Sequence, residues 1–384
     1  MMARLGDYIE QIRGVSYKPE DVCSSTDIDA VAILRANNIQ DDELNFDDLV
    51  YVKKSKVHEK QYIQKGDIVV CASSGSKNLV GKAAVAKENM LISFGAFCKV
   101  VRPMGLFPKY IGHFFQSPKY RSTISELSGG ANINNIRNEH IDELDIVLVS
   151  EEEQERIINE LDAISSLIFL RKQQLAKLDE LVKSRFIEMF GDQDTNPLGW
   201  KQCTIGECCT LKSGTTLSAE VENEGGSVPY VKVGDMNFPG NERYITTSSR
   251  YVTEETAGKG LFEVGSIIFP KRGGAIGTNK KRMTKLLICA DLNVMGVSSN
   301  GELLPEYLFA YFDLIDLGEL SDGSSVPQIN NKNIAPLVIC IPPMEFQEQF
   351  AAFVEQTDKS KFEIQKSLQQ LETLKKALMK KYFG

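Results

Sequence analysis

The sequence predicts an α+β protein that contains the same structural unit twice, related by a pseudo-two-fold axis. Three observations lead to this fold class. The chain has 384 residues, which is too long for one compact core. An internal repeat divides it into two halves. Each half contains short β-rich runs followed by one long amphipathic helix, so we expect a globular domain and a helix in each half.

The repeat is clearest at the end of each half. Residues 126–191 align without a gap with residues 319–384, so that ELSGG matches ELSDG and Phe190-Gly191 matches Phe383-Gly384. Two copies are too few for a solenoid. The repeat predicts these boundaries: domain one at 1–149, helix one at 150–191, domain two at 192–341 and helix two at 342–384.

Both long helices carry start signals, and the first also carries a stop signal. Ser150 and Glu153 form a capping-box pattern, Gly191 suits a helix C-terminus, and Pro342-Pro343 precede helix two. The apolar residues form one narrow stripe on each helix, so we expect the two helices to pack on each other. The leucines expected in this seam are Leu175, Leu178, Leu368 and Leu371.

The globular domains are predicted to be mixed. Runs such as DIVVCA, SIIFP and LLICA are rich in β-branched and apolar residues and are separated by Gly, Ser and Asn. They predict a twisted, partly antiparallel sheet. Amphipathic helices are expected at 106–127 and 304–320.

The composition excludes several classes of protein. No run reaches the ~18 apolar residues of a membrane span, and the N-terminus lacks the apolar stretch of a secretory signal. The eight cysteines form no CxxC pair and no zinc-ligand spacing, so buried, reduced thiols are expected. We therefore expect a cytoplasmic protein with no membrane partner and no metal site.

Positive charge is gathered locally, although the chain carries a net charge of −8. The windows 53–65, 89–125 and 271–285 are rich in Lys and Arg and poor in acid, which favours nucleic-acid binding. The loops at 72–77 and 271–275 occupy matching places in the repeat, and glycine there lets a phosphate approach the backbone. Arg272 is a candidate for either a phosphate or a guanine edge. The predicted contacts are Ser73, Ser74, Lys77, Lys99, Arg102, Lys271, Arg272, Gly273, Gly274, Lys280 and Lys281.

No catalytic residues are predicted. The segment Gly75–Lys82 resembles a phosphate-binding loop, but it has one residue too many between its glycines, and Ala83 stands where Ser or Thr is needed. The Ile-Pro-Pro-Met at 341–344 lacks the Asn of the adenine-methyltransferase motif. The simplest interpretation is a binding protein without a catalytic centre.

The duplicated plan resembles the specificity (S) subunit of type I restriction-modification enzymes. The resemblance rests on LRANNI and YVKVGDM early in the halves, on GDIVV and GSIIF, and on INNKNIAPLVICIPPMEFQEQ before the second helix. It covers essentially the whole chain. One departure is that residues 146–151 read IVLVSE where the second copy has ICIPPM.

The resemblance implies a division of labour. Each globular domain would be a target recognition domain that reads one half of an asymmetric, bipartite site on double-stranded DNA. The helices would form an antiparallel coiled coil that separates the domains, sets the spacer and docks methyltransferase (M) subunits. S-adenosylmethionine would bind in those partners and not in this chain, and a restriction (R) subunit would join through the complex.

Two other classes of function stay open at this point. One is a solitary DNA-binding or anti-restriction protein, and the other is a coiled-coil scaffold that binds no DNA.

Overall fold

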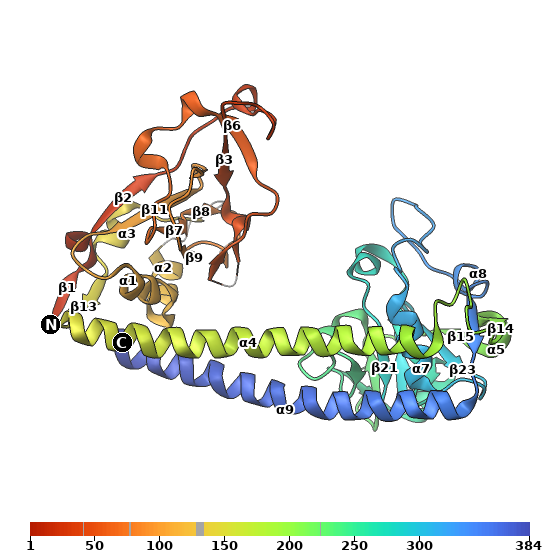
Figure 1. Cartoon of the computed structure of the whole chain (residues 1–384). Coiled ribbons are helices and arrows are strands. Elements are labelled where there is room, and N and C mark those ends of the chain that lie inside the picture. The colour runs from red at the N-terminus through yellow and green to blue at the C-terminus, as the bar shows by residue number, and fades with distance from the viewer. Residues whose placement is uncertain (41, 77, 128–133, 223) are drawn as a thin grey trace. The chain divides into compact units, whose positions relative to one another are not determined.

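A computed structural model of the chain describes residues 1–40, 42–76, 78–127, 134–222 and 224–384. The chain divides into two compact units (Figure 1). Unit 1 contains Met1–Lys172 and Lys366–Gly384, and unit 2 contains Gln173–Gln365. Because these boundaries fall inside the two long helices, each helix contributes one stretch to each unit.

Unit 1 is built around an antiparallel sheet in the order β2-β11-β7-β9, beside a three-stranded sheet in the order β10-β3-β6. All four residues of β7 are buried, which explains its continuous apolar sequence IVVC. The strands of the two sheets are β2 (Ile9–Arg13), β3 (Ala30–Leu34), β6 (Val50–Lys53), β7 (Ile68–Cys71), β9 (Ala83–Val85), β10 (Ser93–Phe94) and β11 (Cys98–Pro103). The shorter strands pair as β1 (Met2–Arg4) with β13 (Asp145–Val147), β4 (Ile39–Gln40) with β5 (Glu43–Leu44), and β8 (Ser73–Ser74) with β12 (Asn134–Asn135). The helices are α1 (Pro108–Gln116), α2 (Pro118–Leu127) and α3 (Asn138–Asp142).

Unit 2 repeats this plan with a sheet in the order β15-β23-β20-β21-β17 and a second in the order β18-β16-β22-β19. The strands of the first sheet are β15 (Cys209–Ser213), β17 (Tyr244–Ile245), β20 (Ile267–Pro270), β21 (Arg282–Thr284) and β23 (Val294–Ser299). Those of the second are β16 (Val228–Val231), β18 (Tyr251–Val252), β19 (Leu261–Phe262) and β22 (Ile288–Ala290). A further pair joins β14 (Lys201–Thr204) to β24 (Val338–Ile341). The helices are α5 (Ile205–Cys208), α6 (Glu254–Ala257), α7 (Pro305–Leu314) and α8 (Asn331–Ile334).

The long helices confirm the repeat. The first is α4 (Glu151–Phe190) and the second is α9 (Met344–Phe383), each with 40 residues. After α4, Gly191 takes a φ of +72° and donates its N–H to the carbonyl of Ile187, as a helix C-terminus requires. The Oγ of Ser150 accepts the N–H of Glu153 at 3.3 Å, but the Glu153 carboxylate binds Arg156, so only half of the expected capping box forms.

The N-terminal stretch of each long helix is tied to a globular domain by a glutamine at the same place in the repeat. In unit 1, the Oε1 of Gln154 accepts the N–H of Phe107 at 3.1 Å. In unit 2, the Oε1 of Gln347 accepts the N–H of Leu304 at 2.8 Å.

The fold class predicted from the sequence, α+β with a duplicated unit, is confirmed.

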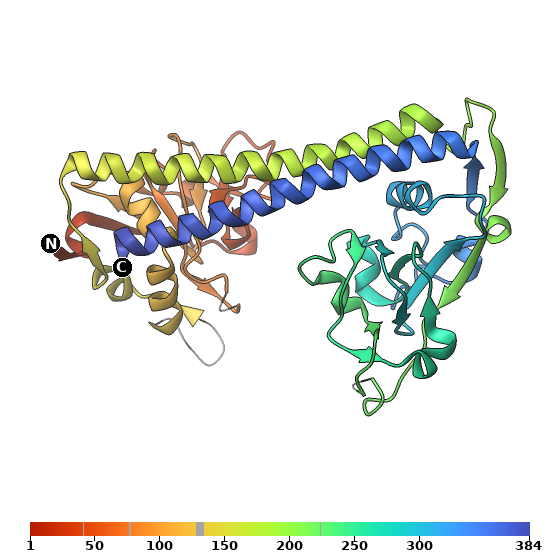
Figure 2. The same cartoon turned by 90° about the horizontal axis from the view of Figure 1, so that it is seen from below.

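Within each unit, the stretches of α4 and α9 lie side by side (Figure 1, Figure 2). In unit 2, Phe186 and Phe190 of α4 both pack on Phe350 of α9, while the earlier Asp179 meets the later Lys361. This order of contacts makes the helices antiparallel.

The four leucines expected in the seam, Leu175, Leu178, Leu368 and Leu371, are half-buried rather than fully buried. Full burial occurs instead where a helix also packs on a globular domain, as at Leu161 and Phe186. A side chain with one neighbouring helix and no sheet against it is covered on one side only.

The shorter helices differ from the sequence prediction. The segment 106–127 forms two helices, α1 and α2, because Pro118 cannot continue the first one. The segment 304–320 is helical only as far as Leu314. Within the described part of the chain, no helix combines the length and apolar character needed to cross a bilayer.

Candidate nucleic-acid interface

Two of the lysines predicted to contact DNA are buried. Lys99 is 6% exposed, and its Nζ lies 3.0 Å from Oε1 of Gln11 and 2.9 Å from Oδ1 of Asn138. Lys281 is 4% exposed and donates to Oδ1 of Asn279 and to the carbonyl of Ile315. Burial lowers the pKa of each ammonium group to about 8. In this structure the protein itself surrounds both ammonium groups, so neither is exposed to a ligand.

Arg102 is also part of the fold. Its Nε and one terminal nitrogen each lie 2.8 Å from a carboxylate oxygen of Asp67, which is 1% exposed. The same terminal nitrogen also donates to the carbonyl of Tyr62 at 3.3 Å. The hydrogen bonds to Asp67 raise the pKa of the guanidinium group. This arginine therefore balances a buried carboxylate inside the fold.

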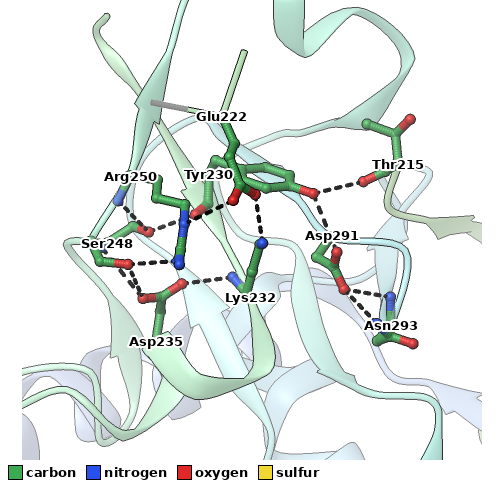
Figure 3. Close-up of polar contacts among 10 residues, drawn as sticks. Thr215, Glu222, Tyr230, Lys232, Asp235, Ser248, Arg250, Asp291 and Asn293 are labelled. Carbon is green, nitrogen blue, oxygen red and sulfur yellow. Dashed lines mark hydrogen bonds and ion pairs between the residues drawn. The ribbon is translucent and has the colours of Figure 1, made fainter. Parts of the chain in front are cut away.

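Other cations of unit 2 are neutralised by an acidic side chain. Glu222 is 9% exposed and lies between Lys232, at 2.5 Å, and Arg250, at 3.5 Å (Figure 3). The Oγ of Ser248 donates to the carbonyl of Tyr230 in the same cluster. This cluster joins the loop before β16 to the segment before β18. Its two cations are therefore used to hold these segments of the fold together.

The basic window 53–65 of unit 1 is partly neutralised in the same way. Lys56 lies 3.0 Å from Asp21, and Lys60 lies 3.1 Å from Glu10. Two hydrogen bonds lower the pKa of Asp21, the stronger effect coming from the backbone N–H of Lys18 and the weaker from the ammonium group of Lys56.

The loop after β20 keeps an exposed cation. Lys271 is half-buried and donates to Oγ of Ser213 at 2.9 Å, and burial lowers the pKa of its ammonium group. Arg272 is exposed, and its guanidinium group has no hydrogen-bond or ion-pair partner among the residues that the structure describes. Gly273 has a φ of +73° and begins a 3-10 turn, Gly273–Thr278, in which Gly274 is exposed. Lys280 lies after this turn, is half-buried and donates to Oδ1 of Asn237.

The matching loop of unit 1 follows β7. Ser73 and Ser74 are half-buried in β8, and the Oγ of Ser74 accepts the N–H of Ser76 at 3.1 Å. Lys77 lies outside the described residues. The fold thus brings Ser73 and Ser74 together in unit 1, and Lys271, Arg272, Gly273, Gly274 and Lys280 together in unit 2.

The structure adds two residues that the sequence prediction missed. Asn135 is the antiparallel partner of Ser73, and Gln328 is the antiparallel partner of Arg272. The gapless repeat already aligns Asn135 with Gln328, one position before the matched Ile136 and Ile329. The pairing with the loops after β7 and β20 is tertiary, so the repeat alone does not predict it.

The chain is similar to proteins of one family. A family model described as "Type I restriction modification DNA specificity domain" matches residues 1–180 and 197–376. The type I restriction enzyme EcoKI specificity subunit of Escherichia coli K12 is 28% identical over 97% of this chain and 86% of its own length. The StySPI specificity subunit of Salmonella potsdam is 36% identical over 62% of this chain and 55% of its own length.

Solved structures share the fold. The S subunit of the type I restriction-modification system from M. genitalium matches with a TM-score of 0.56 and 17% identity, covering 100% of this chain and 96% of that one. A chain from a structure of type I R-M complex assembly matches with a TM-score of 0.58 and 17% identity, covering 100% of this chain and 97% of its own.

Proposed function

Because this chain belongs to the family of type I restriction modification DNA specificity domains, we propose that it is the sequence-recognition subunit of a type I restriction-modification complex. The observation that carries the proposal is the match of the family model to both copies of the repeated unit, at 1–180 and 197–376. The curated relatives named as specificity subunits support it.

The two globular domains, 1–149 and 192–341, are proposed to read the two halves of a bipartite site on double-stranded DNA. Their candidate loops differ in chemistry, with SSGSK in the first copy and KRGGA in the second. Different side chains read different bases, so the proposed site is asymmetric rather than palindromic.

The chemical steps are assigned to partners. Adenine methylation with S-adenosylmethionine is proposed to belong to M subunits, and DNA cleavage to an R subunit that joins through the complex. The present chain would supply sequence recognition and no catalytic residue.

The helices 150–191 and 342–384 are proposed to set the spacer and to dock the M subunits. Support comes from apolar side chains on α4 that face solvent: Leu167 is 47% exposed, Phe169 is 60% exposed and Leu170 is 52% exposed. Apolar side chains gathered on a surface are typical of a protein-protein contact. We expect Phe169→Asp to weaken co-purification with an M subunit, while Phe97→Asp, which changes a 66% exposed phenylalanine of the same unit, does not.

Methylation sequencing tests the whole proposal. Genomic DNA from cells with this gene should carry methyladenine in one bipartite motif, and deletion of the gene should erase that motif. Gel-shift measurements on the purified chain, with and without a co-expressed M subunit, should show DNA binding that the M subunit strengthens. A methylome unchanged by the deletion, together with no gel shift in either form, would contradict the proposal.

A further inference from the structure

A cross-strand pair of polar residues occurs at the same place in the fold of both units. In unit 2, Arg272 opposes Gln328, and in unit 1, Ser73 opposes Asn135. Both pairs are antiparallel and lie directly after the matching strands β20 and β7. The pairs therefore occupy equivalent positions but carry different side chains.

The backbone hydrogen bonds make the two pairs equivalent in geometry as well. In unit 2, the N–H of Ile329 donates to the carbonyl of Lys271 at 2.9 Å. In unit 1, the N–H of Ile136 donates to the carbonyl of Ala72 at 2.8 Å. These bonds flank the pairs, so each is a non-hydrogen-bonded pair, the kind in which Cα atoms approach to about 4.5 Å and the side chains lie closest on one face.

The four side chains are available to a ligand. Arg272 and Asn135 are exposed, and Ser73 and Gln328 are half-buried. None of the four side chains has a hydrogen-bond or ion-pair partner among the described residues. The other predicted cations differ in this respect, since Lys99, Arg102 and Lys281 all bind groups of the protein.

The glycines beside Arg272 support the same conclusion. A Cβ added at Gly274 or Gly277 would meet no atom within 4 Å, and neither residue has a positive φ. Only Gly273, with a φ of +73°, needs glycine for its own backbone conformation. The packing and backbone of the chain therefore do not require glycine at 274 or 277, and glycine at these positions leaves the turn open to close approach by another molecule.

We propose that these two pairs read base edges, with Arg272 reading guanine and Gln328 reading a nearby adenine in one half-site, and Asn135 reading adenine beside Ser73 in the other. The inference rests on the proposed function. A guanidinium group binds O6 and N7 of guanine with two bonds, and a carboxamide binds N6 and N7 of adenine. The pair of unit 1 belongs to the short two-stranded ribbon β8–β12, and the pair of unit 2 is an isolated bridge. A two-stranded element is narrow enough to enter the major groove.

Selection from a library of random DNA duplexes tests the inference on the full chain, alone and with its co-purified M subunit. Arg272→Lys keeps the charge but loses the planar fork. We expect it to reduce the preference for one guanine by about 5- to 150-fold, the loss of one bidentate contact, and to leave the other half-site unchanged. Gln328→Ala should instead erase the preference for one adenine in the same half-site, and Asn135→Ala should affect only the opposite half-site.

The control is Lys259→Ala, which removes an exposed lysine of unit 2 that belongs to neither pair. It should leave both half-sites unchanged. If Arg272→Lys keeps the wild-type guanine preference while Arg272→Ala weakens all sequences equally, Arg272 contacts phosphate and the inference is overturned. If Lys259→Ala produces the same change as Arg272→Lys, the inference is also overturned. If the wild-type chain enriches no sequence in either form, the proposed function fails instead.

Discussion

The Nζ of Lys361 in α9 lies 2.5 Å from Oδ1 of Asp179 in α4, inside unit 2. The side chain of Lys361 is 11% exposed, whereas that of Asp179 is 62% exposed. An ion pair between exposed side chains adds little stability. Here the ammonium group is covered, so the effect of the pair depends on what happens to that group when its partner is removed.

Removing Asp179 alone should therefore lower the free energy of unfolding more than replacing both residues does. We expect Asp179→Ala to lower the free energy of unfolding by about 1–3 kcal/mol, because it leaves a covered donor without an acceptor. The double variant Asp179→Ala/Lys361→Met should recover most of that loss. Urea unfolding of the four proteins in the mutant cycle measures it, and strictly additive losses would contradict the prediction.

Phe383 anchors the end of α9 in the core of unit 1. It is 1% exposed, and its ring lies 5.3 Å from Tyr110 and 5.9 Å from Phe114. Phe383→Ala should lower the free energy of unfolding by about 3–5 kcal/mol through the cavity it leaves. Phe97→Ala, at an exposed phenylalanine of the same unit, should change it by less than ~0.5 kcal/mol. Equal losses in denaturant titrations would show that Phe383 is not a core residue.

Lys280 and Lys281 are neighbours in sequence but not in environment. Lys280 reaches the surface, and Lys281 is 4% exposed. If Lys280 contacts a DNA phosphate, Lys280→Met should make the negative slope of log K for DNA binding against log salt shallower by ~0.9. Lys281→Met should leave the slope as it is. Fluorescence anisotropy over a range of salt concentrations distinguishes the two variants, and a reversed pattern would place the phosphate elsewhere.

Asp162 of α4 makes the stability of unit 1 sensitive to acid. Its Oδ1 lies 2.9 Å from Nε2 of His113, and its Oδ2 lies 2.5 Å from Nζ of Lys109. The hydrogen bond from His113 has the largest effect and that from Lys109 adds to it, and together they lower the pKa of Asp162 from 3.8 to about 2. The carboxylate therefore stabilises the folded state above pH 3.8, and this contribution is lost as the pH falls towards about 2.

The corresponding variant is Asp162→Asn. Its deficit in free energy of unfolding should be largest above pH 3.8 and should shrink between pH 3.8 and about 2. Asp145→Asn, which changes an exposed carboxylate of the same unit, serves as the control. A deficit that stays constant with pH would mean that the ionised form of Asp162 is not what stabilises the fold.

The spacer role of the helices can be tested by lengthening them. Insertions of seven residues after Ala176 in α4 and after Gln369 in α9 fall between the Asp179–Lys361 contact of unit 2 and the Glu160–Tyr382 contact of unit 1, so both contacts are kept. Each insertion adds about 10 Å of helix, which corresponds to ~3 bp of DNA. Methylation sequencing should show the same half-sites with a longer gap. An unchanged gap would mean that the helices do not set it.

The elements that the sequence predicts well are those encoded by local signals and by the repeat. The gapless alignment gives two helices of equal length, and Gly191 ends the first as expected. The break at Pro118 was equally visible in the sequence, and a single helix over 106–127 overlooks it.

The candidate site was harder to predict because charge windows do not show which way a side chain points. Lys99, Arg102 and Lys281 stand in basic windows, but their partners Asn138, Asp67 and Ile315 come from distant parts of the chain. The partners of Arg272 and Ser73 are likewise set by tertiary pairing. The sequence identifies the loops, and only the fold distinguishes the cations that the protein binds itself from those left at its surface.

The packing of Phe383 on Tyr110 also sets an order of events during synthesis. Met379, Tyr382 and Phe383 belong to the same hydrophobic core as Leu5 and Ile9. That core is incomplete until residue 383 has left the ribosome, by which time every residue of unit 2 has already been translated. Domains usually complete their folding in the order in which they emerge. Here the unit that begins the chain finishes last, and a nascent chain stalled before Met379 would expose the apolar surface of its first-made domain.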